Sequence, residues 1–81
     1  MFYVYVLRSL VNKRFYTGST NNLERRINEH NSGKSGYTKL TRPFVLVYKE
    51  EFISRKEAYK REMFLKTGKG RELLKGLIAD C

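Results

Sequence analysis

Two tyrosines that could contact a phosphate stand early in the sequence, in the triplets Tyr3-Val4-Tyr5 and Tyr16-Thr17-Gly18. Each triplet lies in a β-prone stretch, and a short turn separates them, so Tyr5 and Tyr16 can lie side by side across a hairpin. Two phenols at one place can orient a water and approach a phosphate. A free phenol has a pKa of about 10, so a tyrosine base needs positive charge nearby. Taken singly, each tyrosine is better explained as core bulk whose hydroxyl reaches solvent.

Arg26 and His30 are four residues apart, so they share one face of a predicted helix. Arg26 adjoins Ile27 on the inner stripe of that helix and could point across the sheet at the tyrosines. Its planar fork can bind two phosphate oxygens and stabilise charge that develops in a transition state. The alternative is a solvated Arg26 whose stem packs on the core. His30 could be a general base or form a hydrogen bond near the helix end, and the structural role is favoured when it is considered alone.

Glu62 is the residue that fits least with its helical surroundings. Positions 58, 62 and 65 of the predicted helix point in one direction, and the other two are Ala58 and Leu65. A carboxylate on that face is costly unless it is paired or binds a metal. A hard cation such as Mg²⁺ is often held by one or two carboxylates, with waters and substrate phosphate completing its shell. An ion pair, with Arg26 or with a helix neighbour such as Lys66, explains Glu62 equally well.

Positive charge dominates the composition. The chain has 17 lysine and arginine residues against 8 aspartate and glutamate residues, a net charge of +9. That excess favours a polyanionic partner, and nucleic acid is favoured over a membrane surface because no free apolar face accompanies the charges. The cations expected to touch phosphate lie in a central loop and in the C-terminal third: Lys34, Lys39, Arg42, Lys66, Lys69 and Arg71.

The elements that position these residues follow from apolar and turn patterns. Strands are expected over residues 2–7, 14–19 and 44–48, with the first two forming an antiparallel hairpin and a basic loop over 31–43. Three strands with helices on their faces predict an α+β fold, layered α/β, with a three-stranded antiparallel sheet. The 81 residues fit one domain, residues 1–81.

Helices are expected over residues 22–30 and 55–66, capped by Asn21 and Ser54. Gly68 is the expected terminator of the second helix, and a last amphipathic helix follows the next glycine. The element order is therefore strand, strand, helix, strand, helix, helix.

Cysteine and apolar content indicate a compartment. Cys81 is the only cysteine, so an internal disulfide is impossible and a reducing environment is expected. No apolar run approaches the ~18 residues of a membrane helix, and Arg8 interrupts the N-terminal apolar stretch, unlike a signal peptide. We expect a soluble, cytoplasmic protein.

Taken together, these residues resemble the GIY-YIG nuclease superfamily over nearly the whole chain. The chain is most similar to the small single-domain bacterial branch, which is itself similar to the N-terminal nuclease domain of the bacterial excinuclease. The two tyrosine triplets stand at the family's two triplets, and residues 22–31 match its first-helix motif. Residues 58–62 match the helix with the metal-binding glutamate, and residues 65–71 look like the branch's own signature.

The resemblance implies hydrolysis of DNA phosphodiester bonds, in DNA repair or processing, with Mg²⁺ or Mn²⁺ held by Glu62. It implies that Tyr16 helps to activate the attacking water and that Tyr5 orients water or phosphate. Arg26 would stabilise the charge of the phosphate, and the metal would offset charge at the leaving oxygen. His30 stands where some members place a second tyrosine, so it is counted with the catalytic residues.

Some positions depart from the family pattern. Ser19 replaces a lysine of the excinuclease domain, and no asparagine follows Glu62, although many members have one. These departures keep open a catalytically weak or inactive nucleic-acid-binding module, and less so a protein-interaction domain. Sealing of Glu62 in an ion pair would favour the binding module. A chain this small is also expected to bind weakly or to depend on a recruiting partner protein, and its oligomeric state is open.

Overall fold

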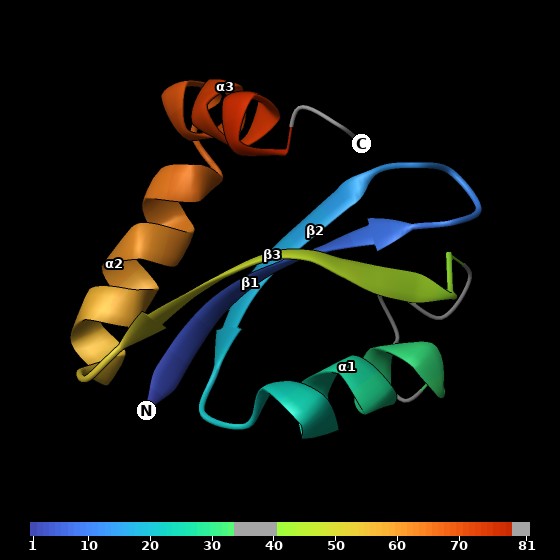
Figure 1. The fold of residues 1–81 in the computed structure, drawn as a ribbon, viewed down its shortest axis with the longest axis horizontal. Coiled ribbons are helices and arrows are strands. Elements are labelled where there is room, and N and C mark those ends of the chain that lie inside the picture. Colours follow the sequence, from blue (N-terminus) through green and yellow to red (C-terminus); the bar gives the residue numbers. More distant parts are fainter. Residues whose placement is uncertain (34–40, 79–81) are drawn as a thin grey trace.

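The computed structural model describes residues 1–33 and 41–78, which form a three-stranded antiparallel sheet with helices on both faces (Figure 1). In chain order the elements are β1 (Phe2–Ser9), β2 (Phe15–Thr20), α1 (Leu23–Asn31), β3 (Phe44–Phe52), α2 (Arg55–Leu65) and α3 (Gly68–Leu77). β1 is the central strand, and β2 and β3 pair with it antiparallel on either side. The predicted fold class and element order are confirmed.

The central strand supplies both halves of the core, because successive side chains of a strand point to opposite faces. Val4 and Val6 are fully buried on the face that α2 and α3 cover. Their partners on those helices are buried as well: Ala58, Leu65, Leu74 and Ile78. The sheet therefore positions α2, the helix that carries Glu62.

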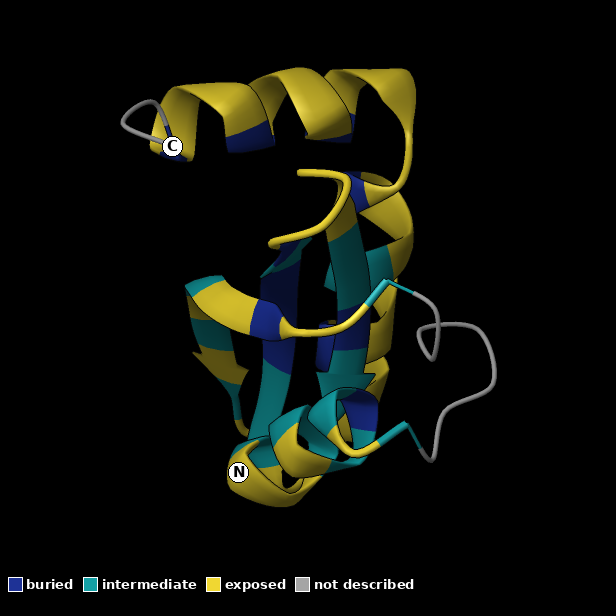
Figure 2. Ribbon diagram, turned by 90° about the vertical axis from the view of Figure 1, so that its right-hand side faces the viewer, coloured by how far each residue is buried: buried dark blue, intermediate teal, exposed yellow. Residues whose placement is uncertain are grey.

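The other face of β1 carries Tyr5 and Leu7, which are also buried. They pack with Phe44 of β3 and with the inner stripe of α1, Leu23 and Ile27. Figure 2 shows the buried residues on the central strand and on the sides of the helices that face the sheet. Tyr5 is thus a core residue of the α1 layer as well as a candidate site residue.

Helix α1 begins one residue later than predicted. Asn22, not Asn21, is its N-cap, since Asn22 is extended and its side-chain oxygen accepts from the Arg25 amide at 3.0 Å. The predicted cap of α2 is confirmed, because the Ser54 hydroxyl accepts from the amides of Lys56 and Glu57. Side chains that satisfy free helix N–H groups decide both starts.

The glycines after α2 act differently from the prediction. Gly68 does not end a helix but begins α3, which the Thr67 hydroxyl caps by accepting from the Gly70 amide at 3.1 Å. Gly70 lies inside α3 and is buried. A Cβ at Gly70 would lie 2.1 Å from the Phe64 carbonyl oxygen, so glycine is what lets the first turn of α3 pack against the end of α2.

Strand β3 continues beyond the predicted residue 48 to Phe52. The charged residues 49–51 interrupt the apolar pattern, so the sequence did not predict this extension. One of them, Glu50, forms an ion pair in the structure. Glu50 accepts from Arg61 of α2 through Nε at 2.8 Å and through Nη2 at 3.1 Å, and it also accepts from the Tyr48 hydroxyl. This two-pronged ion pair ties α2 to the sheet one residue before Glu62.

The Gly70 contact predicts opposite effects of two alanine substitutions in α3. We expect Gly70→Ala to lower the free energy of unfolding by about 1–3 kcal/mol or more, because the added methyl meets backbone atoms that cannot move aside. A Cβ at Gly76 meets nothing within 4 Å. Gly76→Ala should therefore be neutral or stabilise by up to about 1 kcal/mol through helix propensity. Urea denaturation measures both, and equal effects would contradict the packing role of Gly70.

Candidate active site

Tyr5 lies beneath α1 with its ring across the edge strand. It is 1% exposed and pairs with Gly18 of β2. A Cβ at Gly18 would lie 2.5 Å from the Tyr5 hydroxyl oxygen and 2.8 Å from the ring carbon that bears it. The second triplet therefore ends in glycine because the phenol of the first triplet occupies the space of a side chain.

Arg26 and His30 meet the Tyr5 hydroxyl from successive turns of α1. The Arg26 Nε donates to the hydroxyl oxygen at 3.3 Å, and the His30 Nε2 lies 3.3 Å from the same oxygen. Since Arg26 can only donate, the arrangement that satisfies all three groups has the Tyr5 hydroxyl donating to a neutral His30. The two side chains predicted to share a helix face thus share one phenol.

Burial keeps both inner groups of this chain of hydrogen bonds uncharged. His30 is completely buried, and that burial lowers its pKa below the usual 6.5, assisted by the charge of Arg26. Burial likewise raises the pKa of Tyr5 above 10, although Arg26 opposes the shift. Tyr5 is therefore a neutral hydrogen-bonding group at physiological pH and not a base.

Tyr16 lies on the same sheet face as Tyr5. It pairs with Leu7, two positions along β1, which places the two tyrosines diagonally. The His30 ring meets the Tyr16 ring edge-on, with 4.7 Å between ring centroids. His30 thus contacts both tyrosines and fixes their separation.

The Arg26 guanidinium is at the border of this cluster and solvent. Its side chain is 35% exposed, and one terminal nitrogen donates to Glu29 at 3.0 Å. The hydrogen bond to Tyr5 and then the one to Glu29 raise its pKa, so it is always charged. These two bonds use two of its five N–H groups. The remaining donors can bind phosphate oxygens.

Glu62 reaches the same edge strand from the opposite layer. One of its carboxylate oxygens accepts from the Ser19 hydroxyl at 2.6 Å, and the other accepts from the Lys66 Nζ at 2.8 Å. Ser19 follows Gly18 directly, and the charge of Glu62 adds to the rise in the pKa of Tyr5 that burial causes. The Glu62 carboxylate and the Tyr5 phenol therefore lie near each other at the Gly18–Ser19 segment, and the charge of the carboxylate acts on the phenol.

The Glu62–Lys66 ion pair is open to solvent on its lysine side. The Glu62 side chain is 13% exposed, but the Lys66 side chain is 46% exposed. The Lys66 ammonium can therefore exchange Glu62 for water or for another anion without entering the protein interior. The carboxylate is not sealed, because it can be reached from the side on which Lys66 lies. Of the two predicted ion-pair alternatives, the one with Lys66 is present, whereas Arg26 pairs with Glu29.

The donor set suits a hard divalent cation. No group of three or more His, Cys, Asp or Glu side chains within residues 1–33 and 41–78 could hold a metal. One carboxylate is nevertheless enough for Mg²⁺ when waters and substrate phosphate complete its coordination. The Lys66 ammonium already occupies a cation position at Glu62. Glu62 thus fits a hard metal such as Mg²⁺ or Mn²⁺ better than a soft metal that prefers sulfur ligands.

Only some of the predicted phosphate-binding cations lie together in the structure. Lys66 and Arg71 line a groove of about 870 Å³ between β2 and α3. Lys69 is exposed on α3 without lining that groove, and Arg42 is exposed just before β3. Lys34 and Lys39 lie outside the described residues.

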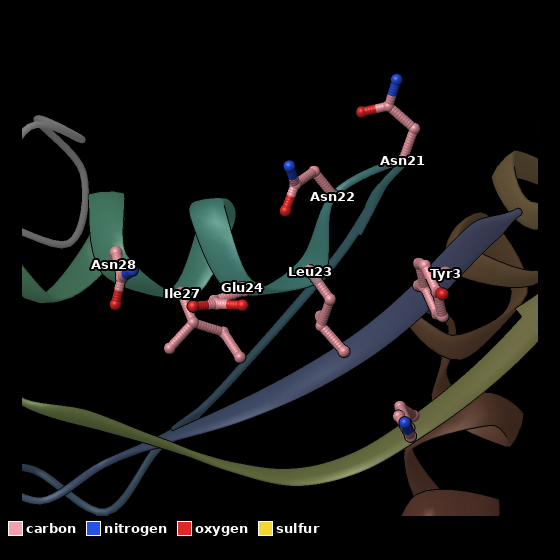
Figure 3. A pocket seen from close by; sticks show the side chains of 8 residues that line it. Tyr3, Asn21, Asn22, Leu23, Glu24, Ile27 and Asn28 are labelled. Carbon is pink, nitrogen blue, oxygen red and sulfur yellow. The ribbon is translucent and has the colours of Figure 1, made fainter.

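A separate pocket of about 520 Å³ lies between the start of α1 and the sheet (Figure 3). Tyr3 lines it together with Leu23 and Ile27 of α1, and Figure 3 shows the Leu23 side chain pointing toward the strands. The side-chain oxygen of Asn22, another lining residue, is already used to cap α1. None of Tyr5, Tyr16, Arg26 and Glu62 lines this pocket, so it is distinct from the candidate active site.

The sequence did not predict the contacts of two residues that support the site, Ser19 and Asn31. Ser19 stood out only as the replacement of a lysine, yet its hydroxyl orients Glu62. The Asn31 amide bonds the Phe44 backbone twice, accepting from N at 2.6 Å and donating to O at 3.1 Å. This pair holds the end of α1 to β3. Neither contact leaves a periodic signal, because each joins residues brought together only by folding.

Comparison with known proteins agrees with this arrangement of tyrosine strands, arginine helix and glutamate helix. A family model described as the GIY-YIG catalytic domain matches residues 1–75. The chain belongs to the GIY-YIG family. Membership places it in a superfamily of nucleases, which generally use divalent metals and act on nucleic acid.

The relatives of this GIY-YIG chain are bacterial proteins of similar size. A UPF0213 protein of Staphylococcus haemolyticus is 49% identical over 74 residues, covering 90% of this chain and 89% of the relative. The UPF0213 protein YazA of Bacillus subtilis is 39% identical over 74 residues, or 88% of this chain and 74% of YazA. The solution NMR structure of a UPF0213 protein from Bacillus halodurans matches with a TM-score of 0.58 and 38% identity, covering 95% of this chain and 85% of that one.

The helices of the described ranges are all too short or too polar to cross a membrane.

The buried neutral His30 predicts acid sensitivity. Because its folded pKa is below 6.5, the unfolded chain binds a proton more readily as pH falls below that value. The contribution of His30 to the free energy of unfolding should be fully present above about pH 6.5 and should decrease as the pH falls from 6.5 to the lower folded pKa. His30 is the only histidine. Melting temperatures measured from pH 7.5 to about 5.5, above the carboxylate range, should fall in the parent chain and stay level in His30→Gln. An equal pH dependence in both proteins would contradict a buried neutral His30.

Proposed function

We propose that this chain is a divalent-metal-dependent endonuclease that hydrolyses phosphodiester bonds of DNA, in repair or processing. One observation carries the proposal. The Arg26 guanidinium, through Tyr5, and the Glu62 carboxylate, through Ser19, are held at adjacent residues of one edge strand. A phosphate placed there can meet a fixed positive charge from α1 and a carboxylate that holds a cation from α2.

Each of the chain's own residues would have a distinct task. Arg26 binds phosphate oxygens with its remaining donors and stabilises the charge that develops on them. Tyr5 stays neutral, accepts from Arg26 to hold the guanidinium in place, and can orient a water that donates to the remaining lone pair of its hydroxyl oxygen. Tyr16 positions the attacking water beside it. His30 is buried, so we assign it a positioning role for both tyrosines.

Glu62 would hold Mg²⁺ or Mn²⁺, with Ser19 orienting the carboxylate. When bound, such a metal supplies a positive charge that offsets charge at the leaving oxygen. Lys66 stands in the way at one Glu62 oxygen and would move to a phosphate as substrate arrives.

The same Lys66 contact supports the alternative function, a nucleic-acid-binding module with weak or no catalysis. A lysine that stayed on Glu62 would keep metal out while the positive surface still bound phosphates. In either case, we propose that residues 1–81 act as one domain and that a partner protein recruits so small a chain to DNA.

The endonuclease proposal predicts loss of cleavage from two substitutions. Arg26→Ala and Glu62→Gln should each reduce nicking of supercoiled plasmid and of branched, damaged and single-stranded oligonucleotides by roughly 10²–10³-fold, the scale of a lost charge-stabilising group. Glu57→Gln, which removes an exposed carboxylate from the first turn of α2, serves as the control. Cleavage that survives both site substitutions unchanged would come from a contaminant and would overturn the proposal. A matched RNA panel tests the choice of DNA.

The Lys66–Glu62 ion pair predicts that a lysine variant binds metal better. Lys66→Met should raise the affinity for Mn²⁺ by about two- to tenfold, because it removes both a competing cation and its repulsion. Titration followed by electron paramagnetic resonance measures the affinity. Lys60→Met, another exposed lysine of α2, should leave it unchanged, and Glu62→Gln should abolish binding. Affinities that are equal in the parent chain and in Lys66→Met would show that Lys66 does not compete.

A further inference from the structure

A basic groove extends from the candidate active site. It lies between the β1–β2 hairpin and α3, with Leu65 and Leu74 buried at its base. Figure 1 shows α3 at the end of the sheet where β1 runs into β2. Three separate parts of the chain therefore build it: the hairpin, the end of α2 and the inner side of α3.

Five cations line this groove, and none of its described lining residues is acidic. Lys13 and Arg14 come from the hairpin, Lys66 from the end of α2, and Arg71 and Lys75 from α3. Arg71 and Lys75 are four residues apart and so share one helix face.

These charges are mostly uncompensated by the protein. Lys66 is paired with Glu62, but within the described ranges no carboxylate forms an ion pair with Arg14, Arg71 or Lys75. Like charges gathered at one groove repel each other and raise the local positive potential. A polyanion relieves that repulsion and releases its counterions, which is the main source of affinity for a nucleic-acid backbone.

Two of the lining residues connect the groove to the site. Tyr16 lines the groove and also contacts His30, and Lys66 lines it and also bonds Glu62. A strand whose phosphate lies at Arg26 and Glu62 can therefore continue directly into the groove. Phe15, another lining residue, is 41% exposed, which is a large apolar surface to leave among cations.

We infer that this groove binds the backbone of a single-stranded nucleic-acid segment that flanks the cleaved phosphate, with Lys13, Arg14, Arg71 and Lys75 on its phosphates and Phe15 stacked on a base. The inference rests on the proposed function. An aromatic side chain between cations is the usual arrangement for single strands, whose bases are free to stack. A concave volume of about 870 Å³ fits a segment of one strand better than the wide convex face of a duplex.

The first test measures binding without cleavage. Anisotropy of a short fluorescein-labelled oligothymidine is followed in EDTA over a series of salt concentrations. Replacing Arg71 and Lys75 together by glutamine should weaken binding roughly tenfold and reduce the log–log salt slope by about 1.4, from two phosphate contacts at about 0.7 each. The matched control replaces Lys56 and Lys60, two exposed lysines of α2 outside the groove, and should change affinity by less than about twofold. Equal losses in both double variants would overturn the groove assignment.

The second test separates stacking from charge. Phe15→Leu should weaken oligothymidine binding roughly fivefold or more, the scale of one base stacked on an aromatic ring. An abasic oligonucleotide with the same number of phosphates should bind Phe15→Leu and the parent chain equally. A loss shared by both oligonucleotides would overturn the stacking assignment.

Two further arms decide the class of ligand. The single-strand assignment would be overturned if replacing Arg71 and Lys75 weakened the binding of duplex DNA more than the binding of oligothymidine. The groove would be assigned to a membrane instead if the Arg71 and Lys75 double variant lost binding to anionic lipid vesicles but bound oligothymidine as the parent chain does. Failure of the proposed function is separate, because an inactive chain would cleave nothing yet could still bind oligothymidine through the groove in EDTA.

Discussion

The contact between Tyr5 and Gly18 is the constraint on which the site depends. Tyr5 is in the middle of the central strand and is buried, so its ring cannot turn toward solvent. It extends instead over the edge strand, where only glycine leaves room for the hydroxyl. That placement brings a phenol from the core to the rim of the sheet. Arg26 and His30 can then approach it from α1.

The candidate site joins two layers that are packed independently. α1 brings its arginine to one face of the sheet, while α2 brings Glu62 to the edge strand from the other. Each helix is fixed by a polar contact to β3, through Asn31 for α1 and through the Arg61–Glu50 ion pair for α2. Such contacts are directional, whereas apolar packing is not, so they set where the side chains of the candidate site point. β3 thus orients the site without contributing to it.

Charge links the candidate site to the groove. Lys66 pairs with Glu62 and also lines the groove, and its ammonium is open to solvent. Within residues 1–33 and 41–78, Arg14, Arg71 and Lys75 of the groove have no ion pair with a carboxylate, which lowers stability slightly and favours a polyanion. For a chain of 81 residues with a modest core, such a surface is a substantial part of the molecule. Binding and folding therefore make opposing demands on the same residues.

The sequence by itself determined the fold class, the order of elements and the family, because strand runs, capping residues and motif spacing are local signals. It also predicted that Arg26 and His30 share a helix face, since four-residue spacing requires it. Tertiary structure alone decided which partners these residues take. The role of Ser19 depends on contact with a residue far away in the sequence, and that of Gly70 on the angle at which α3 packs against the end of α2. Periodicity and composition carry no record of such contacts, so only the packed chain could show that Tyr5 is neutral and that His30 is buried. For Glu62, four-residue spacing already offered Lys66 as one partner, and the structure decided between Lys66 and Arg26.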